Sequence, residues 1–159
     1  MKIGYFCNTT NWMHKLFHKL LDETREITEY CDQNKWDSIW FTEHHFNHEG
    51  MECCTNPLML GTDAAARTKK IRIGQAANII TFHNPIRLAE DIATLDQLSK
   101  GRVDVGIGRG IYGREAIHMN IEADLKDQAK NFRLFEETLT ILKKAWTEKF
   151  FSHKGEFYT

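Results

Sequence analysis

Four short apolar segments alternate along this chain with four segments of helical periodicity, and this alternation restricts the fold more than any other feature of the sequence. The apolar segments cover residues 2–7, 38–42, 71–80 and 103–107. Strands that alternate with helices pair in parallel and are joined by right-handed crossovers. The pattern predicts an α/β fold with a parallel sheet, which is either an open doubly wound sheet or part of a (β/α)8 barrel.

The length of the chain limits how much of a barrel it can form. A complete (β/α)8 barrel takes about 250 residues, and this chain has 159. Four βα units correspond to half of such a barrel. We therefore treat residues 1–159 as one partial TIM-barrel domain.

Both prolines of the chain mark the start of a predicted helix. Asn56-Pro57 and Asn84-Pro85 combine a capping side chain with a first helical residue that has no N–H group to satisfy. We expect the second of these helices to end at Gly101, a natural left-handed cap. The last helix is predicted to begin around Glu122, and residues 150–158 are predicted to form a hairpin.

Charge and composition argue against several classes of partner. Lys and Arg total 21 against 22 Asp and Glu, and no long basic run is present, so electrostatics do not favour a nucleic acid or an anionic membrane. No apolar stretch approaches the roughly 18 residues of a membrane span, and the first residues lack a signal peptide's apolar region. We expect a cytoplasmic protein whose four cysteines, which form no C-x-x-C pair, are reduced.

The strongest candidate for a functional site is the end of the second apolar segment, where large strand-forming residues give way to Glu43, His44, His45 and Phe46. If the strand continues through the histidines, one of them faces a site and the other packs or pairs, because strand side chains alternate. Two titratable histidines at the carboxyl end of a strand are the arrangement expected of an active site. Two ordinary loop histidines are the alternative, since the chain has eight histidines.

A second candidate is the glycine-rich segment 108–113, which matches the dinucleotide motif G-x-G-x-x-G. That motif belongs to the first βα turn and is followed at once by a helix, whereas this segment follows the fourth strand. The glycines can instead allow a flat or phosphorylated ligand to approach the backbone, with Arg109 as the anion-binding side chain.

Residues of the types that bind metals also follow the second strand, but their spacing matches no metal motif. Neither H-x-H on a strand nor H-E-x-x-H on a helix is present, so a metal hydrolase is a minor alternative and we expect no metal. The residues in question are His44, His45, His48, Glu49, Glu52 and Cys53.

Short motifs that cover nearly the whole chain resemble one known family. They are MKIG at 1–4, DSIW at 37–40, EHHF at 43–46, NP at 56–57, KKIRIG at 69–74, AA at 76–77, NPIRLAED at 84–91, LDQLSKGR at 95–102 and GIGRG at 106–110. The last three are the most specific. In this order they resemble the bacterial luciferase-like family of flavin-dependent monooxygenases, and they look most like the N-terminal half of the luciferase catalytic subunit.

The resemblance implies a TIM barrel that uses reduced FMN (FMNH2) and molecular oxygen, with a long-chain aldehyde or similar small molecule as substrate. His44 matches the family's essential histidine, which assists proton transfer around the flavin, and His45 matches its neighbour. Ala76 and Ala77 match a non-prolyl cis peptide beneath the flavin ring. Arg109 matches an arginine that contacts the flavin phosphate.

Two departures from the family bear on function. Gly108, beside the flavin, stands where luciferases carry a reactive cysteine. The resemblance also implies four further βα units that carry most of the phosphate site. The alternative function is therefore a non-catalytic partner, or a fragment that needs a second half to bind flavin, although the retention of Glu43, His44, His45 and Arg109 argues against it.

The resemblance further implies a flavin reductase as the source of FMNH2 and a homo- or hetero-oligomer. Related enzymes pair through the region of residues 86–98, whose small residues Ala89 and Ala93 allow close helix approach.

We predict from the half-barrel interpretation that the chain is not a stable monomer and binds flavin weakly by itself. Unpaired edge strands and uncovered inward faces seek partners, and we expect Ile3, Tyr5, Ile73, Val103 and Val105 to form those inward faces. Sedimentation with a flavin titration tests this. A monodisperse monomer that binds reduced flavin tightly would contradict it.

Overall fold

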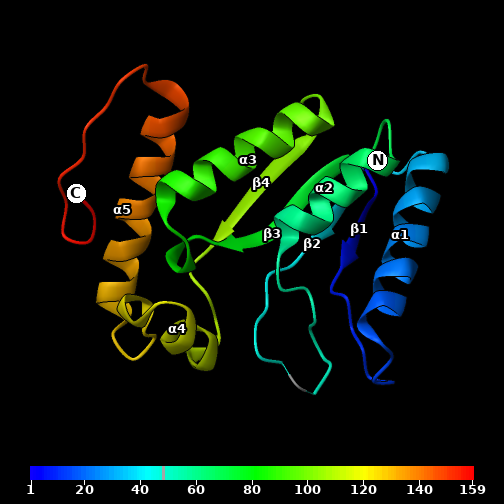
Figure 1. Ribbon diagram of the computed structural model, residues 1–159, viewed down its shortest axis with the longest axis horizontal. Helices are drawn as coiled ribbons and strands as arrows, with labels where there is room; N and C mark the ends of the chain where they lie inside the picture. The colour runs from blue at the N-terminus through cyan, green and yellow to red at the C-terminus, as the bar shows by residue number, and fades with distance from the viewer. Residues whose placement is uncertain (48) are drawn as a thin grey trace. The chain divides into compact units, whose positions relative to one another are not determined.

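The computed structural model describes residues 1–47 and 49–159 and has the α/β fold that the alternating pattern predicts (Figure 1). His48, one of the metal-type residues of the sequence, lies outside the described residues. The elements in chain order are β1 (Gly4–Cys7), α1 (Phe17–Gln33), β2 (Ser38–Phe41), α2 (Pro57–Arg67), β3 (Arg72–Ile79), η1 (Ile80–Phe82), α3 (Pro85–Ser99), β4 (Val103–Gly108), α4 (Gly113–Met119), η2 (Ile121–Ala123) and α5 (Gln128–Thr147).

The chain forms two compact units, and each is described by itself. The first unit consists of residues 1–78 and 94–106, and the second of residues 79–93 and 107–159. The first contains most of the sheet with α1 and α2, and the second contains α4 and α5.

The strands lie in the order β1-β2-β3-β4. β1 pairs with β2 in parallel, and β2 pairs with β3 in parallel with Phe41 opposite Gln75 as the last pair in register. The predicted parallel sheet is confirmed. β2 ends at Phe41, so the histidines do not stand on a strand and the argument from alternating faces does not apply to them.

The core of the first unit lies between the sheet and the helices α1 and α2. Its largest members are fully buried residues of the strands and of the segment just before β3, namely Ile39, Phe41, Ile71 and Ile73. They pack with Cys31 of α1, with Ala64 and Ala65 of α2, and with the partly buried Tyr5 and Val103. Our expectation that Tyr5, Ile73 and Val103 face inward is wrong, because these side chains face the helices.

The opposite face of the sheet carries Trp40. Its indole nitrogen donates a hydrogen bond to Ser38 Oγ at 2.8 Å, and its ring lies over Gly74, where a Cβ atom would overlap the ring. Gly4 is also close, since a Cβ there would lie 3.3 Å from the indole nitrogen and 2.6 Å from Ser38 Oγ. Glycine is thus required next to Trp40 for steric reasons. Phe6, on the same face, is 59% exposed, so β1 is only partly buried.

Two charged side chains fix the segment that leads into β3. Asp32, near the end of α1, accepts hydrogen bonds from the backbone N–H groups of Lys69, Lys70 and Ile71 at 2.7–3.1 Å. Arg102 donates to the carbonyl oxygens of Ala65, Thr68, Ile71 and Ser99 and to the Thr68 hydroxyl. Burial raises the pKa of Asp32, but its hydrogen bonds outweigh this and hold the pKa below its ordinary value.

Both Asn-Pro pairs begin helices as predicted. Asn56 Oδ1 accepts the N–H of Met59 at the start of α2, and Asn84 Oδ1 accepts the N–H groups of Ile86 and Arg87 at the start of α3. After α3 ends at Ser99, Gly101 has a φ of +79°, the left-handed conformation expected of a cap.

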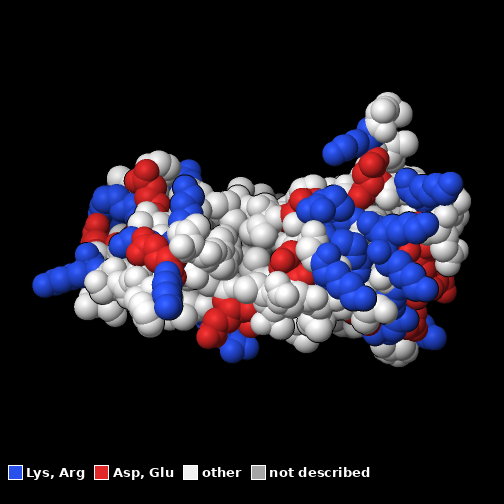
Figure 2. All heavy atoms as spheres, turned by 90° about the horizontal axis from the view of Figure 1, so that it is seen from above, with Lys and Arg blue, Asp and Glu red and all other residues white. Residues whose placement is uncertain are grey.

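Basic side chains gather before the strands of the first unit. Lys2, Lys35 and Lys70 precede β1, β2 and β3, and with Arg72 and Asp104 they line a cavity of about 740 Å³. On the face seen in Figure 2, Lys and Arg side chains lie over the part of the first unit that contains α1 and α2.

The second unit differs from the sequence prediction at two places. A short helix, α4, begins at Gly113, the last residue of the glycine-rich segment, and the last helix begins at Gln128 rather than near Glu122. The expectation that no helix follows the glycines at once is therefore wrong. The core of this unit contains Ile79, Phe82, Ala116, Ala123 and Leu134.

Ala89 does not lie on an exposed helix face. It is 4% exposed, and its carbonyl oxygen accepts a hydrogen bond from the Trp146 indole at 3.1 Å within the second unit. An expected interface along residues 86–98 therefore cannot use Ala89, although Ile86 and Ala93 are exposed.

Residues 150–158 form no strand, so the predicted hairpin is wrong. The segment instead folds onto the Glu137 carboxylate of α5, which accepts hydrogen bonds from the N–H groups of Glu156, Phe157 and Tyr158 and pairs with His153 Nε2 at 3.0 Å. Burial raises the pKa of Glu137, but these hydrogen bonds outweigh it and hold the pKa below its ordinary value of 4.5.

We predict that Glu137→Gln destabilises the protein by about 1.5–3 kcal/mol at pH 7, because hydrogen bonds to a charged acceptor are replaced by bonds to a neutral one. The folded pKa lies below the unfolded one, so the stabilisation is complete above pH 4.5 and is lost as the pH falls through the folded pKa. Urea unfolding midpoints measured from pH 7 to pH 3 test this.

The matched control for this prediction is Glu136→Gln, the exposed neighbour on the same helix. It should leave the midpoint nearly unchanged. A Glu137→Gln effect that is equally large at pH 3 and pH 7 would contradict the prediction.

Candidate functional site

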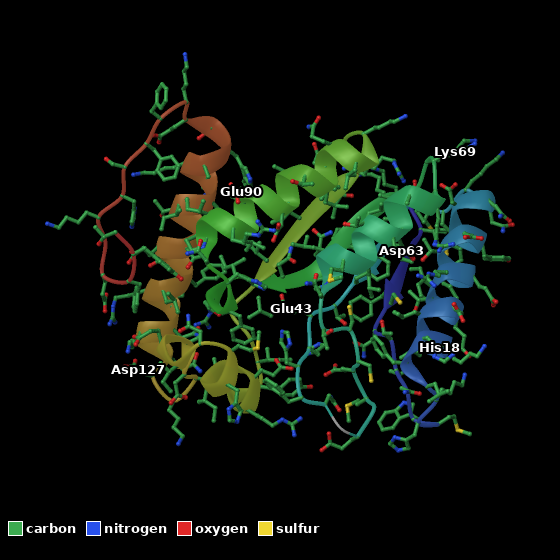
Figure 3. All side chains as sticks on the ribbon, in the orientation of Figure 1. His18, Glu43, Asp63, Lys69, Glu90 and Asp127 are labelled. Carbon is green, nitrogen blue, oxygen red and sulfur yellow. The ribbon has the colours of Figure 1, made fainter. Side chains whose placement is uncertain are left out.

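The candidate site of the first unit lies at the carboxyl edge of the sheet, where the chain leaves β2. The described residues between β2 and α2, 42–47 and 49–56, contain no helix or strand and form a loop, and Figure 3 labels Glu43 at its start. The His44 N–H donates to the Cys54 carbonyl at 2.8 Å, and the Cys53 N–H donates to the Thr9 carbonyl at 3.1 Å. These bonds close the loop on itself and attach it to the segment after β1.

His44 faces a carboxylate from the far side of this loop. Its Nδ1 atom lies 3.5 Å from Glu52 Oε2, and the two side chains are only 12% and 15% exposed. The pairing follows from the backbone bond between His44 and Cys54, which brings position 52 beside position 44. A histidine held near a carboxylate in a partly buried site can accept and release a proton.

His45 is paired with a different carboxylate and through its other ring nitrogen. Its Nε2 atom lies 3.1 Å from Glu43 Oε1, and the Glu43 side chain is 1% exposed. The His45 ring also lies 6.0 Å from the Phe46 ring, between centroids. Because its Nε2 atom contacts the buried Glu43 carboxylate, His45 is placed to stabilise the loop. His44, by contrast, faces Glu52 with its Nδ1 atom.

The thiols near this site are poor nucleophiles. Burial raises the pKa of Cys54 to about 12 and also raises the pKa values of Cys7 and Cys53. All four cysteines are free. Since the thiolate is the reactive form, these residues act as packing residues.

Ala76 and Ala77 follow Gln75, the last residue of β3 in register with β2, at the same edge as His44. Both are half-buried, and the peptide bond between them is cis, as the resemblance implies. Gly106 packs against this part of β3, where a Cβ atom would overlap the Gln75 carbonyl oxygen. The edge therefore presents backbone and methyl groups rather than large side chains.

The second unit holds the other two predicted residues, Gly108 and Arg109. The Arg109 guanidinium donates to Asn131 Oδ1 at 3.1 Å and lies 5.5 Å above the Phe132 ring. The Arg109 carbonyl accepts hydrogen bonds from Thr81 Oγ1 and Asn131 Nδ2. These contacts fix the arginine within its own unit, and its predicted role in binding a phosphate stays a prediction.

Sequence reasoning did not identify the role of Glu52. From the sequence, Glu52 is identified only as one of the residues of the types that bind metals, whereas in the structure it lies beside His44, eight positions earlier. The only signal was that Glu52 is one of three acidic residues in the polar segment 42–56. Among the described residues, no group of three His, Cys, Asp or Glu side chains could hold a metal ion. In the same part of the chain, no helix is both long enough and apolar enough to cross a membrane.

Comparisons with known proteins agree on one family. The family model described as luciferase-like monooxygenase matches residues 1–159. The oxygenase component of the flavin-dependent trigonelline monooxygenase of Acinetobacter baylyi is 32% identical over 140 residues, covering 88% of this chain and 37% of that protein. The alkanal monooxygenase beta chain of Photorhabdus luminescens is 33% identical over 159 residues, covering 99% of this chain and 47% of that protein.

Two solved structures share the fold. The oxygenating constituent of 3,6-diketocamphane monooxygenase from Pseudomonas putida, in complex with FMN, matches with a TM-score of 0.92 and 25% identity, over 99% of this chain and 43% of that one. The monooxygenase RslO1 from Streptomyces bottropensis matches with a TM-score of 0.86 and 27% identity, over 99% and 46%. The chain thus spans less than half the length of these relatives, which agrees with half a barrel.

We predict that His45→Ala lowers the free energy of unfolding by about 1.5–3 kcal/mol, because it removes a hydrogen-bond partner from the buried Glu43 carboxylate. His44→Ala should cost less, since the Glu52 carboxylate is more exposed. Urea unfolding of both variants measures the difference.

A double-mutant cycle with Glu43→Ala separates the pair from the packing of each residue. The double variant should be more stable than the sum of the single losses implies, because no buried carboxylate is left without His45. Additive losses would show that the pair does not stabilise the loop.

Proposed function

Because this chain belongs to the luciferase-like monooxygenase family, we propose that it carries the proton-transfer histidine and part of the flavin-binding surface of a flavin-dependent monooxygenase. In this proposal the reaction uses reduced FMN and molecular oxygen, and the substrate is an aldehyde or a similar small organic molecule. The relatives support it, since one is an alkanal monooxygenase chain and another is the oxygenase component of a flavin-dependent monooxygenase.

The observation that carries the proposal is the position of His44. It follows the carboxyl end of β2, its side chain is only 12% exposed, and a carboxylate stands beside its Nδ1 atom. A histidine in such a setting can transfer a proton near neutral pH while bulk water is kept away.

The residues around His44 fit a flavin ring. Ala76 and Ala77 are small and only half-buried, so a planar ring system can approach the backbone of β3 at the same edge of the sheet as the histidine. In the proposal these two residues support the ring, and the contact of Gly108 with the ring and of Arg109 with the phosphate of FMN stays an expectation from the family resemblance.

When bound, reduced flavin supplies two electrons, so that one atom of O2 enters the substrate and the other leaves as water. The contribution of this chain is to hold and move a proton at His44. His45 contributes indirectly, because its bond to Glu43 keeps the start of the loop in place.

Partners form a further part of the proposal. A flavin reductase would provide FMNH2, and the name of the Acinetobacter baylyi relative as an oxygenase component agrees with such an arrangement. We also propose a cytoplasmic setting and a homo- or hetero-oligomer, in line with the reduced cysteines and the beta-chain relative.

The second candidate function is a non-catalytic partner, or a fragment that needs a second half to bind flavin. The observation in its favour is that the chain covers 37–47% of the curated relatives named above. In that case His44 contributes its chemistry only in the complete assembly.

We predict that His44→Ala lowers oxygenation about 10²–10⁴-fold, because proton transfer by a positioned side chain contributes this much. The assay supplies photoreduced FMN, air and decanal and measures decanoic acid. FMN binding, followed by flavin fluorescence, should be unchanged in the variant.

The control is His18→Ala, an exposed histidine on α1 (Figure 3). Equal yields from His44→Ala and the unmodified protein would remove His44 from the mechanism. Unmodified protein that neither binds FMN nor forms product would favour the second candidate function.

A further inference from the structure

We propose that Glu52 is a positioning residue that fixes the tautomer of His44, an inference that rests on the proposed role of His44 in proton transfer. In this arrangement the proton of neutral His44 stays on Nδ1, facing Glu52. The lone pair is then on Nε2, the nitrogen that exchanges a proton during the reaction.

The first support is geometric. Glu52 Oε2 lies 3.5 Å from His44 Nδ1, at the outer limit of hydrogen-bond distance. Hydrogen bonds of catalytic groups are often long before substrate or cofactor binds, and they tighten in the complex.

The second support is the environment of the carboxylate. The Oε2 atom of Glu52 is buried, and no group among the described residues donates a hydrogen bond to it in the structure. A buried carboxylate oxygen gains free energy by accepting a donor, and the neighbouring donor is Nδ1–H of His44. Glu43, by contrast, is already hydrogen-bonded to His45 at 3.1 Å.

The third support is that the loop holds the pair at its backbone. The bond from the His44 N–H to the Cys54 carbonyl at 2.8 Å joins the two segments that carry the pair. The bond from the Cys53 N–H to the Thr9 carbonyl attaches the second segment to the chain after β1. Glu52 therefore stays beside His44 without depending on its own side-chain contacts.

The two histidines differ as a result. His45 faces its carboxylate with Nε2 and His44 faces its carboxylate with Nδ1, so the adjacent rings are expected to be opposite tautomers. The difference can be observed by ¹⁵N NMR, because protonated and unprotonated ring nitrogens have distinct chemical shifts.

The test compares the chain with Glu52→Leu, which removes the carboxylate and adds no new donor or acceptor. The ¹⁵N spectrum of selectively labelled histidine should show neutral His44 with its proton on Nδ1 in the unmodified protein. In Glu52→Leu the Nδ1-protonated population should fall by at least half, whereas Glu52→Asp should restore it in part. Glu26→Leu, an exposed position on α1, is the control and should leave the spectrum unchanged.

Folding and activity are measured on the same variants. The amide signals of His44 and Cys54 report whether the loop keeps its backbone bond, and a Glu52→Asp spectrum decides the question if Glu52→Leu loses that bond. In the oxygenation assay, Glu52→Leu should lower kcat about 10- to 100-fold with little change in KM, as expected for a residue that orients a reacting group.

An unchanged His44 tautomer in a folded Glu52→Leu protein would overturn the proposal. A changed tautomer with an unchanged kcat would overturn the catalytic consequence. If the function proposed for the chain is wrong, His44→Ala has no effect on oxygenation while the tautomer of His44 still depends on Glu52, so the two failures can be distinguished.

Discussion

The structure depends on the way Asp32 and Arg102 fix the segment before β3. The Asp32 carboxylate accepts hydrogen bonds from three backbone N–H groups that would otherwise need water. The Arg102 guanidinium donates hydrogen bonds to backbone carbonyl oxygens of the same segment. Both groups are charged, and hydrogen bonds to charged groups are stronger than neutral ones. Since β3 starts at Arg72, this anchoring sets its register with β2, from Ser38 opposite Arg72 to Phe41 opposite Gln75.

That register decides what appears at the other edge of the sheet. With Phe41 opposite Gln75, the chain after β2 and the pair Ala76-Ala77 emerge side by side. A shift by one residue would turn Ile73 away from the helices and bring Gly74 out from under Trp40. The amino-terminal edge, where Asp32 and Arg102 act, is therefore structural, and the carboxyl edge carries the histidines, a division of labour common to parallel α/β folds.

Features that depend on neighbouring residues could be predicted from the sequence. Features that depend on contacts between residues distant in the sequence could not. The Asn-Pro helix starts and the left-handed Gly101 depend on neighbouring residues only, and the structure has them where the sequence indicates. The end of β2 at Phe41 could not be predicted, because Thr42 and Glu43 are as compatible with a strand as with a loop. The pairing of Glu52 with His44 depends on the backbone hydrogen bond between His44 and Cys54, which are ten residues apart. Residues 153–158 are held by the Glu137 carboxylate, which lies more than a dozen positions earlier in the sequence. Apolar periodicity carries no signal for either.

The buried thiol of Cys54 has a consequence for survival under oxidative stress. Peroxide reacts with thiolates far faster than with thiols. With a pKa of about 12, only about one Cys54 side chain in 10⁵ is ionised at pH 7. The Cys54 carbonyl holds the His44 backbone, so conversion of this residue to a sulfinic or sulfonic acid would introduce a charge into the core beside the loop. Burial thus keeps this packing residue in the chemical form that peroxide attacks least.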